Sequence, residues 1–67
     1  MLNHIEEYFE TGAKAGRAMS RGDAHTAAFH RRWFTEAKAL ERGDDKDKAS
    51  EAFRDGYRKG AARYWEC

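Results

Sequence analysis

The tripeptide Arg-Gly-Asp occurs twice, at residues 21–23 and 42–44, and divides the 67-residue chain into three segments of similar length. Arginine complements the negative end of a helix, glycine adopts the left-handed conformation that follows many helices, and aspartate caps the next helix. The chain contains no proline, and no segment alternates with the two-residue period of a strand. The sequence therefore predicts one all-α domain over residues 1–67, with helices near 3–21, 23–42 and 44–65.

The first and third predicted helices share a phenylalanine followed by two glycines. The motif Phe-x2-Gly-x3-Gly begins at Phe9 and again at Phe53, a shift of 44 residues. A glycine inside a helix costs about 1 kcal/mol relative to alanine, so we expect a compensating close approach of two helix backbones. Chance repetition in an Ala/Gly-rich chain is the alternative. The predicted packing residues, which can meet within one chain or between two, are Phe9, Gly12, Gly16, Phe53, Gly56 and Gly60.

The apolar residues of the first two helices differ in how widely they spread around the helix. In the first helix they predict a narrow seam, with alternating spacings of three and four, formed by Leu2, Ile5, Phe9, Gly12, Gly16 and Met19. In the second helix they span about 140°, from Phe29 through Trp33 to Phe34, with Leu40 on the Phe29 side. We expect this wide arc either to lie between the other two helices or to place one edge in an oligomer interface.

The chain has few side chains with which to build a core. Val, Ile, Leu and Phe together number seven, but the formal net charge is only +1, and nine aromatic residues and twelve alanines remain for packing. Disorder requires low hydrophobicity together with high net charge, so a compact fold is the better prediction. We expect a three-helix bundle, or a helical hairpin with a third helix, completed by homodimerisation because domains of this size are marginal. A stable monomer is the alternative.

Catalytic and metal-binding patterns are missing from the sequence. His25 and His30 lie about 140° apart around a helix, which does not suit one metal, and His4 is distant from both in sequence. Cys67 is the single cysteine, no serine has a histidine at a suggestive spacing, and the glycines form no phosphate-binding loop. No apolar run approaches a membrane span, and no leader peptide precedes the first helix. We therefore predict a cytoplasmic protein without enzymatic activity, cofactor or metal.

Protein binding has the clearest candidate residues. Trp65 lies off the apolar face of the third helix and close to Arg54 and Arg58, and a second patch is formed by Arg31, Arg32 and Trp33. Tryptophan and arginine are enriched in the residues that dominate protein interfaces. Two alternatives stay open, a small nucleic-acid-binding regulator and a self-assembling structural module. The near-neutral charge disfavours the nucleic-acid alternative.

Residues 19–23, 29–34 and 53–57, together with the small size of the chain, carry a resemblance to a broad class of proteins. The chain resembles the small, charged, all-helical accessory proteins of temperate bacteriophages and related mobile elements. This resemblance implies a phage-encoded protein of the host bacterial cytoplasm that binds and inhibits, or modulates, a host protein or defence complex, as anti-CRISPR proteins do. It transfers no functional residue, because the likeness is one of style and size.

Overall fold

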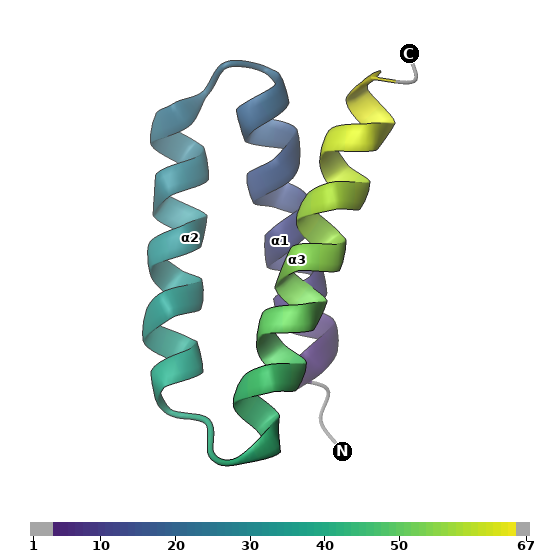
Figure 1. Cartoon of the computed structure of the whole chain (residues 1–67). Helices are drawn as coiled ribbons and strands as arrows, with labels where there is room; N and C mark the ends of the chain where they lie inside the picture. Colours follow the sequence, from purple (N-terminus) through teal and green to yellow (C-terminus); the bar gives the residue numbers. More distant parts are fainter. Residues whose placement is uncertain (1–3, 66–67) are drawn as a thin grey trace.

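Three helices make up the described part of a computed structural model, which covers residues 4–65, with side chains described from residue 5 to residue 62. The helices are α1 (His4–Ser20), α2 (Ala24–Ala39) and α3 (Asp44–Trp65), and no strand occurs in this range. Figure 1 shows α1 and α3 running in the same direction and α2 returning between them in the chain. α1 packs most extensively on α3 and less on α2, whereas α2 and α3 meet only slightly. The all-α, three-helix prediction is confirmed.

The first turn joins the end of α1 to the start of α2 through two overlapping caps. Gly22 has a φ of 82°, and its N–H donates to the carbonyl of Met19 at 3.0 Å. The N–H of Asp23 donates to the carbonyl of Ala18 at 2.8 Å, which completes a Schellman motif. The Asp23 carboxylate then accepts from the backbone N–H of Thr26 at 3.1 Å and caps α2. The predicted roles of glycine and aspartate are confirmed at this turn.

We expect Asp23→Ala to lower the melting temperature by several degrees at neutral pH, because the variant loses the cap of α2. Hydrogen bonds from Thr26 lower the pKa of Asp23, so the stabilisation is present above the ordinary carboxyl pKa and is lost as the pH falls below it. Thermal denaturation followed by circular dichroism at several pH values measures both effects. Asp44→Ala is the matched control, since Asp44 lies in the first turn of α3 and is exposed. An equal response from the two variants contradicts the capping role.

The second turn does not repeat this geometry. α2 ends at Ala39 rather than near residue 42, and Gly43, with a φ of 54°, lies beyond the end of the helix. The Nζ of Lys46 donates hydrogen bonds to the carbonyl oxygens of Lys38 and Ala39, with N···O distances of 3.3 and 3.4 Å. The backbone N–H groups of Leu40 and Glu41 also donate to the carbonyls of Ala37 and Lys38, at 3.1 and 2.9 Å. These bonds close the last turn of α2, and the Lys46 ammonium compensates its negative end, without a glycine directly after the helix.

The predicted capping role of Asp44 is wrong. The N–H of Asp45 donates to the carbonyl of Arg42 at 3.0 Å, and the N–H of Lys46 donates to that of Gly43 at 3.2 Å. These bonds close the first turn of α3 from residues 42 and 43, and Asp44 is already the first helical residue. Its carboxylate is instead one of the acidic groups in the first turn of α3, where a negative charge interacts favourably with the positive end of the helix dipole.

The two glycine motifs face each other across the contact between α1 and α3. A Cβ atom on Gly12 would collide with the carbonyl oxygen of Phe53, and a Cβ atom on Gly56 would collide with that of Phe9. The second glycine of each motif repeats the relation, with Gly16 against Tyr57 and Gly60 against Ala13. The motifs thus pair reciprocally, which gives α1 and α3 a local two-fold relation.

The sequence leaves open whether the glycines of the two motifs meet within one chain or between two. All four glycines are buried against backbone atoms of the same chain. Helices that approach this closely bring Cα–H groups to facing carbonyl oxygens, a weak but recurrent hydrogen bond of helix interfaces. In this structure α1 and α3 occupy each other's glycine faces, and whether the chain also forms a homo-oligomer stays a prediction.

Among the residues with described side chains, the core contains one large side chain among alanines. Tyr8 is 3% exposed, and the other buried apolar side chains are Ala15, Ala18, Ala27, Ala49 and Ala52. The centre of the Tyr8 ring lies 5.7 Å from the centre of the Trp33 ring and 5.8 Å from that of the Phe34 ring. The Tyr8 hydroxyl donates a hydrogen bond to the Glu41 carboxylate at 2.7 Å. Phe34 also stacks on Phe53, with 4.1 Å between the ring centres. The rings of Tyr8, Trp33, Phe34 and Phe53 thus join all three helices.

The predicted packing faces of α1 and α2 are partly wrong. Ile5 and Met19 are each 41% exposed, Leu2 lies outside the described residues, and α1 instead buries Tyr8, Ala15 and Ala18 beside its glycines. α1 has two neighbours and therefore needs a wider face than the narrow seam. α2 buries only Ala27, which lies about 160° from Phe29. Of its wide apolar arc, Phe34 and Ala37 pack against the core, whereas the edge with Phe29 and Leu40 is largely exposed.

Candidate protein-interaction site

Three large apolar side chains are exposed along one face of α2 and directly after it. Phe29 is 65% exposed, Trp33 38% and Leu40 83%, and we refer to these three residues as the α2 stripe. Spacings of four and seven residues place them within about 40° of one another, over about 16 Å of helix. Exposed apolar side chains that gather in one place mark interaction surfaces more often than scattered ones. The α2 stripe is therefore the leading candidate site.

The stripe is exposed because α2 uses its other side for packing. Ala27 is buried and Phe34 is half-buried, and Phe34 stacks on Phe53 of α3. Lys38 extends from this packed side, with its Nζ 5.3 Å from the centre of the Phe34 ring and 3.3 Å from the Ser50 hydroxyl. These contacts set the rotation of α2 and leave the stripe directed away from α3.

Trp33 is the most firmly held member of the stripe. Its ring is tilted against that of Tyr8, which is itself buried and hydrogen-bonded to Glu41. Trp33 and Leu40 line a shallow depression, whose other lining residues are Glu7, Tyr8, Ala37 and Glu41. An aromatic ring that is already positioned loses little conformational freedom when a partner covers it.

Charged residues of both signs border the stripe. Arg32 and Glu36 are exposed on the flank of α2 away from Ala37, and neither forms an ion pair with a described residue. His25 and Arg32 line a second shallow depression together with Ala28 and Phe29. The apolar stripe with its charged border has the composition of a protein interface, which combines an apolar centre with a polar rim.

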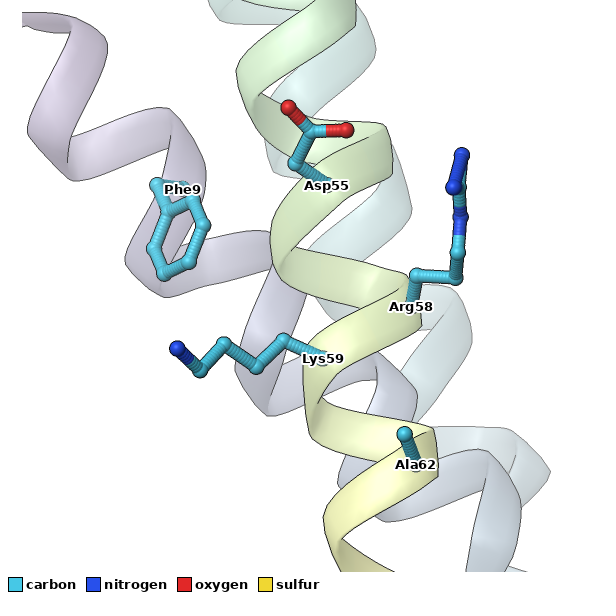
Figure 2. A pocket seen from close by; sticks show the side chains of 5 residues that line it. All are labelled: Phe9, Asp55, Arg58, Lys59 and Ala62. Atoms are coloured by element: carbon cyan, nitrogen blue, oxygen red, sulfur yellow. The ribbon is translucent and has the colours of Figure 1, made fainter.

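A second open surface lies between α1 and α3. Figure 2 shows Phe9 of α1 beside four residues of α3, namely Asp55, Arg58, Lys59 and Ala62. Lys59 extends toward the side occupied by the Phe9 ring, whereas Arg58 points away from it. Phe9 is half-buried, whereas Phe29 and Leu40 of the α2 stripe are largely exposed.

The structure separates the residues that the sequence nominates for binding. Arg32 and Trp33 lie together at the α2 stripe, whereas Arg31 is exposed about 160° away from Phe29. Arg54 and Arg58 are exposed on α3, on a different helix. The side chain of Trp65 lies outside the described residues, so the proposed patch of Trp65 with these arginines stays a prediction.

Sequence reasoning missed Phe29 and Leu40 as candidate binding residues, because it assigned them to packing or to an oligomer edge. The signal was present, since both lie within about 40° of Trp33, which the sequence does nominate. What was lacking was the position of Ala27 as the buried centre of α2. A single alanine carries too little hydrophobicity to reveal the packed side of a helix that also carries two phenylalanines and a tryptophan.

Among residues with described side chains, no three histidine, cysteine, aspartate or glutamate residues lie close enough together to hold a metal ion. Within the described part of the chain, no helix has the length and apolar character needed to cross a membrane.

Comparisons with protein-family models, with curated proteins and with solved structures found no match for this chain.

Proposed function

We propose that this chain is a non-enzymatic protein-interaction module that engages a partner protein through the α2 stripe. The observation that carries the proposal is the exposure of Phe29, Trp33 and Leu40 along one side of α2. Full burial of a large apolar side chain stabilises a complex by about 1.5–3 kcal/mol, so these residues can supply much of a binding free energy. Aromatic residues at the centre of such a patch are typical binding hot spots.

The resemblance to phage accessory proteins supports a bacterial host protein or defence complex as the partner. In this proposal the chain acts stoichiometrically, because it inhibits or modulates the partner by covering a surface that the partner uses. Arg32 and Glu36 at the border of the stripe contribute orientation more than affinity, since exposed charges mainly affect association rate and specificity. A role in nucleic-acid binding is one outcome that the experiment distinguishes.

We expect the double variant Phe29→Ser/Leu40→Ser to lose its partner, with affinity reduced at least about tenfold. The fold should be retained, because both side chains are largely exposed before binding. Tagged wild-type and variant proteins are incubated with a nuclease-treated bacterial lysate, and retained proteins are quantified by mass spectrometry. Calorimetric titration with the purified partner then measures the change in affinity.

Ile5→Ser/Met19→Ser is the matched control, since it removes two partly exposed apolar side chains from α1 instead of α2. A set of retained proteins that is identical for wild type and the Phe29→Ser/Leu40→Ser variant contradicts the proposal. Arg54→Ala/Arg58→Ala is a further arm, and loss of the partner in this arm alone moves the binding site to α3. Retention of nucleic acid without nuclease, and of nothing with it, supports the nucleic-acid alternative instead.

A further inference from the structure

The α2 stripe and its charged border are complementary to themselves when one copy of α2 is reversed against another. We propose that the α2 stripe binds a second copy of this chain, with the two α2 helices antiparallel about a two-fold axis that passes between Phe34 and Thr35. This inference rests on the proposed function, because it names one occupant of the same surface. A two-fold dimer uses the same patch on both subunits, so the patch has to match itself.

The apolar residues match themselves in this register. The axis places Phe29 opposite Leu40 of the second copy, and the symmetric contact places Leu40 opposite Phe29 of the second copy. Trp33 lies beside the axis, so the two tryptophans pack at the centre of the interface. The two most exposed large apolar side chains, which are 65% and 83% accessible in the isolated chain, are then covered together.

The charged border also matches itself, and it selects the antiparallel orientation. Arg32 and Glu36 lie on one flank of α2, and antiparallel helices place the same flank of each copy side by side. Arg32 therefore meets Glu36 of the second copy, and the contact occurs twice. A parallel two-fold pairing would place this flank opposite the Ala37 flank of the second copy, so Arg32 and Glu36 would not meet.

Self-association and partner binding use the same residues and are therefore mutually exclusive. The dimer covers the stripe at high concentration of the chain, and dissociation exposes it to a partner. The structure offers a reason for such a dimer. In the described part of the chain the buried core is one tyrosine and a set of alanines, and the largest apolar side chains of α2 are not buried in it.

The experiment exchanges the charges at the border and measures dimer dissociation by sedimentation equilibrium from low-micromolar to millimolar concentration. Arg32→Glu alone and Glu36→Arg alone each place like charges in both pairs, and we expect each to weaken dimerisation by about tenfold. An equimolar mixture of the two single variants restores opposite charges in both pairs. We expect this mixture to dimerise about as well as wild type.

The mixture separates contacts between chains from effects within one helix. Arg32 and Glu36 are four residues apart, so each single substitution also changes local charge along α2, but mixing two proteins cannot repair a change within one chain. The matched controls are Lys59→Glu and Asp55→Arg on α3, which have the same charge changes at the same spacing in the α1–α3 surface of Figure 2. We expect both controls to dimerise like wild type. Circular dichroism verifies that all variants are folded.

Three results overturn the inference. They are a wild-type chain that is monomeric over the whole range, a dimer that is insensitive to Arg32→Glu and Glu36→Arg, and a mixture of the single variants that stays monomeric. None of them affects the proposed function, which fails only when capture of other proteins is unchanged by Phe29→Ser/Leu40→Ser. A dimer that forms as expected while no other protein is retained supports the inference and removes the proposed function.

Discussion

Gly56→Ala is expected to reduce the free energy of unfolding by about 1–3 kcal/mol, although alanine is the better helix former by about 1 kcal/mol. The new Cβ would lie 2.9 Å from the carbonyl carbon of Phe9 and 3.0 Å from the backbone nitrogen of Ala13, with the Phe9 carbonyl oxygen closer still. All three are backbone atoms of α1, so no change of side-chain rotamer removes the collision and the two helices have to separate. Urea denaturation followed by circular dichroism measures the loss.

Whether Gly56→Ala lowers or raises the free energy of unfolding distinguishes close helix packing from helix propensity alone. Helix propensity alone predicts that Gly56→Ala stabilises the protein, so a more stable variant contradicts the close contact of α1 and α3. Ala62→Gly, at an exposed position of the same helix, measures the propensity effect by itself. Gly12→Ala should cost about as much as Gly56→Ala, because each glycine faces the other helix in the same way. The double variant should cost less than the sum, since helices separated by one Cβ make room for the second.

Tyr8→Ala is expected to reduce the free energy of unfolding by about 3–5 kcal/mol. Tyr8 is the one large side chain in the buried core of the described residues, and its ring contacts those of Trp33 and Phe34. Small alanines surround the site and cannot extend into the cavity. A loss of this size is a large part of the total stability of a small domain, so we expect thermal denaturation to show a mostly unfolded variant.

Tyr8→Phe separates the ring from the hydroxyl. It keeps the ring contacts and removes the hydrogen bond to Glu41, so we expect a cost of about 1 kcal/mol. Burial, followed by the hydrogen bond to Glu41, raises the pKa of Tyr8 in the folded state above its ordinary value of 10.0. The contribution of the Tyr8 hydroxyl to the free energy of unfolding is therefore fully present below pH 10 and decreases as the pH rises above it. The reason is that Tyr8 loses its proton at a lower pH in the unfolded chain than in the folded one. Wild type should lose more stability than Tyr8→Phe between neutral pH and pH 11, and parallel pH profiles contradict this role.

The turns show how far local chemistry predicts structure. Residues 21–23 and 42–44 have the same sequence, yet the first triplet forms a Schellman motif and a helix cap, and the second does neither. In the second turn Lys46 satisfies the last carbonyls of α2 from the following helix. Backbone bonds from Leu40 and Glu41 close the same helix end before the tripeptide is reached. The tripeptide alone therefore does not indicate where a helix ends.

The candidate binding surface was harder to predict than the helices. Phe29, Trp33 and Leu40 have the hydrophobicity of core residues, and hydrophobicity measures the gain from burial without indicating whether a neighbour is available. In the structure Ala27 and Phe34 turn the opposite side of α2 inward, so the stripe faces outward. Of the predicted patch, Arg32 and Trp33 lie at the stripe and Arg31 does not, and whether any of the three binds a partner stays a prediction.

The sequence by itself determined three helices, the all-α class and the positions at which glycine favours close packing, because these depend on interactions within a few residues along the chain. Only the tertiary structure decided that α1 is the central helix, that the glycine motifs pair within one chain and that the α2 stripe is left exposed. The physical reason is that small residues permit close approach without specifying the partner. Which helices meet depends on the competition of all three faces for contact, and α1 and α3 meet most closely because their glycine faces fit each other.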